Sequence, residues 1–345
     1  MNVLIRTDAS SIIGTGHIIR CLTLADELTQ NGGKVEFICR EEPGNMINYI
    51  EKRGYEVKPL SAGIELETDR KLSKDFFGKY PRPIDWLVVD HYELDARWES
   101  YMRSSVQKIM VIDDMANRPH DCDLLLDQNY NEIPNRYQGL VPDSCTQMLG
   151  PEYALLRPQF SKARGKLRNR TGEIKRILVF MGGTDPTNQT CKVLRAIEKL
   201  NSPDIAVDTV IGATNKNSDE IERLASNMSN TTCHCNVENM SELMAAADLS
   251  IGAAGATAWE RCCVGLPGLI IIIADNQIEI AENLSKRGII TNLGWFEDVK
   301  QSDIKSALEN LLDKPDIIRQ MSVDGMRMVD ALGTERVARE LIYVK

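Results

Sequence analysis

The chain begins with the stretch that decides its fold, MNVLIRTDASSIIGTGHIIR at residues 1–20. Residues 2–7 are apolar and β-branched enough to form a buried strand. A loop at residues 8–16 follows, and an amphipathic helix then runs from His17 to a stop at Gly32-Gly33. A strand, a loop of small residues and a helix in this order are typical of the ligand-binding edge of an open α/β sheet.

The loop ends in Gly14-Thr15-Gly16, and Gly14 and Gly16 allow a ligand to approach the backbone closely. The first turn of the following helix offers unpaired N–H groups that suit an anion. His17 stands at the junction, where a neutral imidazole can accept a proton from water. An equally acceptable interpretation is that His17 only caps the helix. A GxGxxG dinucleotide motif would need glycine where Ile19 stands, so NAD is not expected.

Length and composition exclude several classes of function. A chain of 345 residues is long enough for two domains. Its 41 basic and 50 acidic residues give a net charge of −9, which argues against a nucleic-acid or membrane-surface partner. Asp8 interrupts the N-terminal apolar run, so no signal peptide is expected. The nine cysteines lack paired zinc spacing, and we expect free thiols, a cytoplasmic setting, no metal and no cofactor.

Strand and helix patterns alternate along both halves of the chain, which predicts two similar α/β domains with a cleft between them. The polar segment 61–83 interrupts the first half and is interpreted as a variable excursion. The polar and basic run at 150–176 is interpreted as the crossing between domains, partly a surface helix. Within this crossing, Arg157 precedes a proline that restrains its backbone, and it could clamp a phosphate or carboxylate.

Four loops fall at the carboxyl ends of predicted strands and could face the same cleft. They are residues 12–17, 90–94, 182–185 and 253–257. In the second loop Tyr92 could point into the cleft, and in the third Gly182, Gly183 and Thr184 suit a phosphate or sugar. Asp113-Asp114 invites a metal interpretation, but adjacent carboxylates point to opposite sides of a strand.

The stretch AAGATAWE at 253–260 carries a nucleotide-binding hypothesis. Small residues lead into a helix, leaving the amides of Gly255, Ala256 and Thr257 open to a diphosphate. Glu260 lies one turn further on, where a carboxylate can accept two hydrogen bonds from ribose hydroxyls. The alternative is a surface glutamate that compensates the helix dipole.

Polar side chains follow the next predicted strand as well. Asn276 and Gln277 could contact a sugar, or could simply cap the helix after them. Arg20, one turn after His17, could bond substrate or brace its loop.

Six blocks of the sequence together resemble one family. The blocks are RTDASSIIGTGHIIRCLTLADEL, VVDHYELDARWE, VIDDMANRPHDCDLLLDQNY, LGPEYALLRPQF, FMGGTDPTN and ADNQIEIAENL. They resemble the UDP-2,4-diacetamido-2,4,6-trideoxy-β-L-altropyranose hydrolases of pseudaminic acid synthesis and the spore-coat polysaccharide proteins grouped with them. The second half also resembles the UDP-GlcNAc-using transferase of peptidoglycan synthesis.

The resemblance implies a glycosyltransferase-B-type fold, with two Rossmann-like α/β domains facing a cleft. It implies a sugar-binding catalytic domain at 1–155, a UDP-binding domain at 156–330 and a C-terminal helix at 331–345. The implied reaction is metal-independent attack of water on the anomeric carbon of a small-molecule UDP-sugar, with inversion and loss of UDP.

The family's base matches His17, and its substrate contacts match Arg157, Glu260 and Tyr92. The family varies in the small-residue loop, which reads AAGATAW here. Two alternatives remain: a glycosyltransferase that uses the same UDP-sugar with an acceptor, and a UDP-sugar sensor that binds without turnover.

Overall fold

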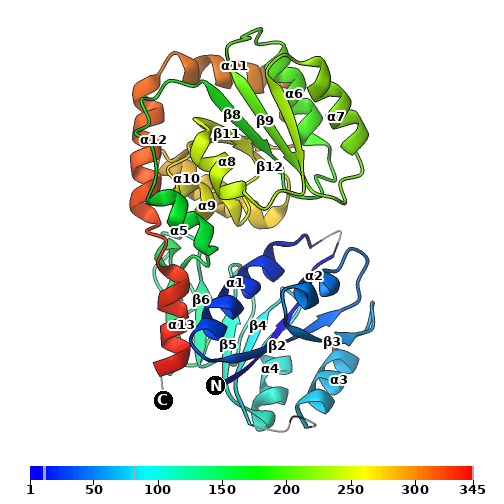
Figure 1. Ribbon diagram of the computed structural model, residues 1–345. Coiled ribbons are helices and arrows are strands. Elements are labelled where there is room, and N and C mark those ends of the chain that lie inside the picture. The colour runs from blue at the N-terminus through cyan, green and yellow to red at the C-terminus, as the bar shows by residue number, and fades with distance from the viewer. Residues whose placement is uncertain (11–12, 79, 81–82, 344–345) are drawn as a thin grey trace. The chain divides into compact units, whose positions relative to one another are not determined.

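The structure is a computed structural model, and it describes residues 1–10, 13–78, 80 and 83–343. Ile12, where the first candidate loop was expected to begin, lies outside these residues. The chain divides into two compact units (Figure 1). Unit 1 contains Met1–Leu155 together with the segment from Leu332 onward, and unit 2 contains Leu156–Ala331.

Unit 1 is built on a seven-stranded sheet in the order β3-β2-β1-β4-β5-β6-β7, with every pair parallel. Its strands are β1 (Asn2–Thr7), β2 (Lys34–Arg40), β3 (Glu56–Leu60), β4 (Ile84–Asp90), β5 (Val106–Ile112), β6 (Leu124–Asp127) and β7 (Thr146–Leu149). Its helices are α1 (Gly16–Gln30), α2 (Ile47–Lys52), α3 (Leu66–Gly78), α4 (Ala96–Met102) and α13 (Gly333–Tyr343), with short 3-10 turns η1 (Arg103–Ser105) and η2 (Pro151–Tyr153).

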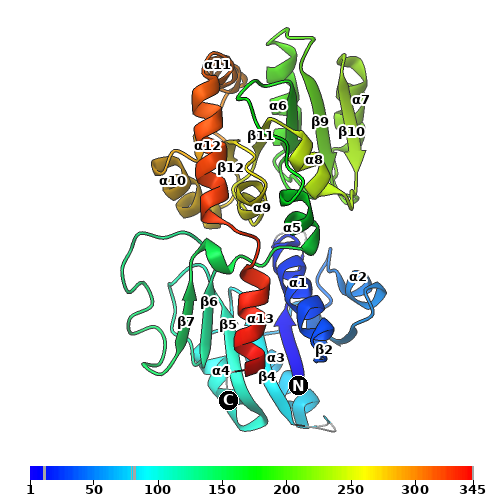
Figure 2. The ribbon, with the colours of Figure 1, turned by 60° about the vertical axis from the view of Figure 1, so that its left-hand side comes forward.

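Helices cover both faces of this sheet, as the nearly continuous apolar central strands require. One face packs against α1 and the C-terminal helix α13, which lie beside each other in Figure 2. The indole Nε1 of Trp86 on β4 donates to the carbonyl of Leu341 on α13 at 2.9 Å, which fixes the last helix onto the first sheet. The other face packs against α3 and α4, where Trp98 is fully buried.

Unit 2 repeats this plan with a six-stranded parallel sheet in the order β10-β9-β8-β11-β12-β13. Both sheets therefore have the Rossmann order around their first strands, β1 and β8. The strands of unit 2 are β8 (Arg176–Phe180), β9 (Ala206–Ile211), β10 (Thr231–Cys235), β11 (Leu249–Gly252), β12 (Gly268–Ile272) and β13 (Ile290–Trp295). Its helices are α5 (Pro158–Arg164), α6 (Gln189–Glu198), α7 (Ser218–Asn227), α8 (Met240–Ala246), α9 (Thr257–Cys263), α10 (Ile278–Lys286), α11 (Gln301–Leu312) and α12 (Pro315–Met328), with the 3-10 turn η3 (Asp275–Gln277).

The structure differs from the prediction for the polar segment 61–83. It was interpreted as a variable excursion, but it contains the 13-residue helix α3. The buried positions of α3 are Asp69, Ser73 and Phe77, so two of the three side chains that face inward are polar. Hydrophobic periodicity indicates this helix only weakly, because polar Asp69 and Ser73 share its buried face with Phe77.

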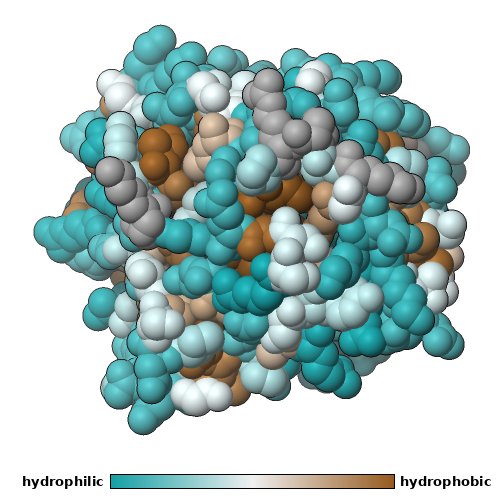
Figure 3. Space-filling view, turned by 90° about the horizontal axis from the view of Figure 1, so that it is seen from below, coloured by the Kyte–Doolittle hydropathy of each residue, from teal (hydrophilic) through white to brown (hydrophobic). Residues whose placement is uncertain are grey.

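No helix among the described residues is both long and apolar enough to cross a membrane. On the face of unit 1 drawn in Figure 3, hydrophilic side chains predominate and hydrophobic ones occupy smaller areas among them.

Candidate functional site

Acidic residues mark the carboxyl ends of four neighbouring strands in unit 1. Asp8 follows β1, Asp90 ends β4, Asp113 follows β5 and Asp127 ends β6, and each is at most 2% exposed. Each carboxylate is paired with an arginine. The pairs are Arg6–Asp8, Arg20–Asp90, Arg118–Asp113 and Arg136–Asp127. The edge where α/β sheets bind ligands is thus lined with rigid, hydrogen-bonded charges.

His17 lies at this edge, in the first turn of α1. Register pairs Thr7 of β1 with Asp90 of β4, so the loop after β1 passes beside that carboxylate. The His17 Nδ1 atom lies 2.5 Å from Asp90 Oδ1. A contact this short to an ionised carboxylate requires a proton on Nδ1, so the 3.2 Å approach of Arg20 Nη2 to the same atom is not a hydrogen bond to it.

This assignment leaves the second ring nitrogen of His17 as an acceptor. Among the residues that the structure describes, none bonds Nε2. The His17 side chain is 8% exposed. A carboxylate that fixes the tautomer and orientation of an imidazole, with the opposite nitrogen unoccupied, is the arrangement of a general base.

Arg20 braces the carboxylate that holds His17. It donates to both oxygens of Asp90, at 2.7 Å from Nε and 2.6 Å from Nη2. Burial would raise the pKa of Asp90, but Arg20 and His17 outweigh it and hold this pKa well below its usual range. Asp90 therefore remains ionised, and Arg20 forms its ion pair with Asp90.

Tyr92 and Asp114 complete the group around His17. The Tyr92 ring meets the His17 ring edge to face, with centroids 4.7 Å apart. Its hydroxyl lies 3.5 Å from Asp114 Oδ2, an oxygen that also accepts from Arg20 Nη1 at 3.2 Å. The prediction placed His17, Arg20 and Tyr92 in the site, and the structure brings these three together. The prediction missed Asp90 and Asp114, which link these three residues.

A second charged network joins the ends of β1 and β2 to α3. Arg6 donates to Asp8 at 2.6 Å and to Asp69 of α3 at 2.7 Å, and Arg40 donates to Asp69 at 2.9 Å. The Asp8 carboxylate also accepts from the backbone N–H of Arg40 and from Nε2 of His91. These contacts fix the start of the loop that leads to His17.

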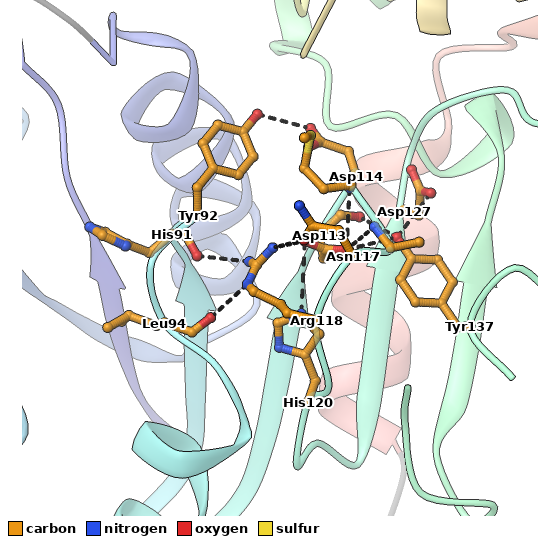
Figure 4. A network of polar contacts seen from close by, with 12 residues as sticks. His91, Tyr92, Leu94, Asp113, Asp114, Asn117, Arg118, His120, Asp127 and Tyr137 are labelled. Atoms are coloured by element: carbon orange, nitrogen blue, oxygen red, sulfur yellow. Dashed lines mark hydrogen bonds and ion pairs between the residues drawn. The ribbon is translucent and has the colours of Figure 1, made fainter. Parts of the chain in front are cut away.

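Figure 4 shows the third network, at the ends of β5 and β6. Arg118 donates to the carbonyls of His91 and Leu94 and pairs with Asp113, so it ties the loop after β4 to the loop after β5. Asp113 and Asp114 have different partners, because they point in different directions. The Tyr137 hydroxyl lies within 3.1 Å of carboxylate oxygens of both Asp113 and Asp127.

Two groups in this network titrate far from their usual range. Burial, followed by the nearby Asp114 charge, raises the pKa of Asp127 to about 7, against the partial opposition of the Asn129 backbone N–H and of Arg136. Burial would lower the pKa of His120, but Asp113 and Glu99 outweigh it and raise the pKa to about 9.

Unit 2 brings its two predicted loops together at its own carboxyl edge. Register pairs Phe180 of β8 with Gly252 of β11, so the loops 182–185 and 253–257 start side by side. Gly182 has φ +89°, a conformation that side-chain-bearing residues rarely adopt. A Cβ on Gly212 would lie 2.5 Å from the carbonyl oxygen of Gly183, so these backbones touch. Thr184 follows Gly183 in the same loop.

Glu260 and Arg157 meet within unit 2. Arg157 precedes Pro158, has extended backbone (φ −57°, ψ 143°), and immediately precedes α5. Its Nη2 donates to Glu260 Oε1 at 2.9 Å. Burial raises the pKa of Glu260, and Arg157 partly opposes that rise. Two residues predicted as separate substrate contacts thus form one ion pair.

Gln277 braces the small-residue loop. Its side-chain oxygen accepts from the backbone N–H of Ala254 at 3.3 Å and of Ile273 at 3.2 Å. Asn276 stands beside it in η3. Gly255, Ala256 and Thr257 form the approach to α9 and its first turn.

Comparison with known proteins agrees with this architecture. Residues 177–332 match the Glycosyltransferase family 28 C-terminal domain. Over 99% of both chains, the structure resembles that of MurG from Acinetobacter baumannii, with a TM-score of 0.68 and 14% identity. It also resembles UDP-GlcNAc 2-epimerase from Neisseria meningitidis, with a TM-score of 0.66 and 12% identity over 99% of this chain and 100% of that one. The chain has the glycosyltransferase-B fold.

Two curated relatives confirm the resemblance found in the motifs. The chain is 29% identical to the UDP-2,4-diacetamido-2,4,6-trideoxy-beta-L-altropyranose hydrolase of Campylobacter jejuni, over 84% of this chain and 97% of that protein. It is 24% identical to the spore coat polysaccharide biosynthesis protein SpsG of Bacillus subtilis, over 98% of this chain and 96% of that one. Both relatives align with this chain over most of its length.

Proposed function

We propose that this glycosyltransferase-B protein is a UDP-sugar-processing enzyme, and specifically a hydrolase. Its substrate would be a UDP-linked 2,4-diacetamido-2,4,6-trideoxy sugar, and its products UDP and the free sugar. The observation that carries the proposal is the His17–Asp90 contact, with Nε2 of His17 unoccupied by any described residue. The relationship to the Campylobacter jejuni hydrolase supports the choice of substrate.

In the proposed reaction His17 orients a water and accepts its proton at Nε2. The water oxygen forms a bond to the anomeric carbon as the bond from that carbon to the UDP oxygen breaks, so the configuration inverts. UDP leaves with the bonding electron pair. Asp90 stabilises the imidazolium that forms and keeps Nδ1 protonated. General-base assistance of this kind contributes roughly 10²–10⁴-fold to the rate.

Unit 2 is the proposed binding site for UDP. The ribose hydroxyls would bind Glu260, whose Oε1 already accepts from Arg157. The diphosphate would bind the amides of the 253–257 loop, the 182–184 loop and Arg157, which stabilise the charge that develops on the leaving group. These groups supply the stabilisation without a metal ion, so we propose a metal-independent reaction.

The proposed setting is the cytoplasm, where the free sugar would enter pseudaminic acid synthesis. A second candidate is a glycosyltransferase, favoured by the match to the family 28 C-terminal domain. It would use the same UDP-sugar and deliver the sugar to an acceptor in place of water.

Proton NMR of the purified protein with a panel of UDP-diacetamido sugars, without acceptor and with EDTA, tests the proposal. We expect UDP and free sugar to appear together, with the first-formed anomer inverted relative to the substrate. Turnover only after an acceptor is added would establish the transferase instead. A strict requirement for a divalent cation would contradict the metal-independent mechanism.

A further inference from the structure

Arg261 is a buried cation of unit 2 that the proposed reaction does not use. It lies on α9, directly after Glu260, and is 3% exposed. Its side chain points back along the helix, as helical side chains do. Nη1 donates to the carbonyl of Ala253 at 3.0 Å and lies 3.3 Å from Oγ1 of Thr257. The guanidinium therefore joins the two ends of the 253–257 loop from underneath.

The charge of Arg261 has no acidic partner in the part of the chain that the structure describes. Among the described residues, no carboxylate oxygen lies within 4.0 Å of it, and its Nε and Nη2 atoms are buried without hydrogen-bond partners. The neighbouring carboxylate of Glu260 is paired with Arg157. Burial lowers the pKa of Arg261 to about 10, so it is still charged at neutral pH. A buried and unpaired cation is costly, and such groups are ordinarily paired.

The side chain of Arg261 lies close to the backbone of two neighbouring strands. A Cβ on Gly268 would lie 3.4 Å from Nε of Arg261, and one on Gly252 would lie 3.7 Å from Nη1. The side chain thus runs over two glycines, one at the start of β12 and one at the end of β11. Its guanidinium is directed toward the edge of the sheet that bears the loop.

Another buried arginine of unit 2, Arg170, is satisfied by backbone carbonyls at the end of a helix. Arg170 donates to the carbonyls of Met244, Ala245 and Ala247 at the end of α8, where a cation is favourable. Arg261 instead approaches the first turn of α9, beside N–H groups that already carry partial positive charge. An anion bound at the 253–257 loop would offset the free-energy cost of burying the Arg261 charge there.

We propose that Arg261 is a positioning residue for the diphosphate of the substrate. It holds the 253–257 loop through Ala253 and Thr257, and it supplies from beneath the positive charge that makes this loop a site for a nucleoside diphosphate. The inference rests on the proposed UDP site of unit 2.

Two substitutions separate its charge from its hydrogen bonds. Arg261→Lys keeps the charge, whereas Arg261→Gln keeps a neutral donor that can reach a carbonyl. Arg327→Gln, on the exposed surface of α12, removes one charge without disturbing a buried group and is the matched control. Titration calorimetry gives UDP affinity, ligand-observed NMR gives uridine affinity, and thermal unfolding checks the ligand-free proteins.

We expect Arg261→Gln to weaken UDP binding about tenfold or more, with uridine affinity changed less than about twofold. Arg261→Lys should stay within about threefold of wild type for UDP, and Arg327→Gln should match wild type. The unfolding midpoint of ligand-free Arg261→Gln should stay within about 3 °C of wild type, because the variant loses an unpaired buried charge along with its hydrogen bonds.

Equal losses of UDP and uridine affinity, or unchanged UDP affinity in Arg261→Gln, would overturn the inference and leave the UDP site standing. Should Arg261→Gln not fold, a loss of UDP affinity in Arg261→Lys well beyond threefold, matched by an equal loss of uridine affinity, would do the same. A wild-type protein that does not bind UDP would overturn the proposed function itself.

Discussion

Nδ1 of His17 and Oδ1 of Asp90 lie 2.5 Å apart, although the two residues are 73 positions apart in the chain. The contact exists because β1 and β4 are neighbours in the parallel sheet, which brings the start of α1 beside the end of β4. Arg20 donates to both oxygens of the same carboxylate. The orientation of His17 is thus set by rigid elements rather than by its own loop.

His17→Asn should lower turnover strongly while leaving UDP affinity close to wild type. The substitution removes the proposed proton acceptor, and the proposed UDP contacts lie in unit 2. We expect kcat to fall roughly 10²–10⁴-fold. Coupled detection of UDP release and calorimetry with UDP measure the two effects separately. Substantial activity in the variant would rule out His17 as the base.

Asp90→Asn should lower kcat about 10²-fold or more with the histidine still present. An asparagine amide can donate to Nδ1, which favours the tautomer with its proton on Nε2 and so removes the acceptor. The pH profile of kcat should change as well, because the carboxylate no longer supports the imidazolium. Asp143→Asn, an exposed change in the same unit, is the control. A variant with normal kcat and pH profile would show that Asp90 is only structural.

Glu260→Ala should weaken UDP binding about tenfold or more, since it removes the proposed ribose contact and leaves Arg157 without its 2.9 Å partner. Calorimetry with UDP is the measurement. Glu282→Ala, at an exposed position of α10, should bind UDP like the wild type. Unchanged affinity in Glu260→Ala would remove this residue from the site.

Asp127→Asn should make stability less dependent on pH. The pKa of Asp127 is raised from 3.8 to about 7, so between these values the folded protein holds a proton that the unfolded chain has released. The free energy of unfolding contributed by this group therefore falls as pH rises from about 4 to about 7, and the loss is complete above that range.

Asparagine cannot titrate, so Asp127→Asn should gain on the wild type as pH rises and be the more stable protein at pH 8. Urea unfolding at pH 5 and pH 8 compares the two proteins. A difference between them that is the same at both pH values would contradict the raised pKa.

Asp69→Ala should be strongly destabilising, by about 3–5 kcal/mol, because it removes a buried carboxylate that accepts from both Arg6 and Arg40. It also removes the acceptor of the Trp98 indole at 2.9 Å. Asp75→Ala, an exposed position of the same helix, should change stability by about 0.5 kcal/mol or less. Denaturant unfolding of both variants is the measurement, and similar midpoints would show that the buried contacts of Asp69 contribute little to stability.

Elements with a strong apolar pattern could be predicted from the sequence. The strands ending before Asp8 and at Asp90 are nearly continuous apolar runs, as central parallel strands are. The edge strands β7 and β13 carry no such run: TQML has one buried residue of four, and ITNLGW is mostly half-buried. Neither strand was predicted, because an edge strand need not be apolar.

Some residues of the candidate site could be predicted from the sequence, and others could not. His17 and Tyr92 stand in recognisable local motifs, so residue type and position were enough to select them. Asp90 was passed over although it begins the same DHY block as Tyr92, since its role depends on register between strands far apart in the chain. Arg157 and Glu260 were each selected, but their pairing across 103 residues is a property of the fold alone.

The return of α13 to the first sheet bears on the order in which the molecule is made. On a ribosome, residues 156–331 are all synthesised before the helix that carries Leu341 and covers the apolar face beside Trp86. Domains usually fold in the order in which they are synthesised, with the amino-terminal one first. Here unit 2 can fold before unit 1 has acquired its last helix, so that order is reversed.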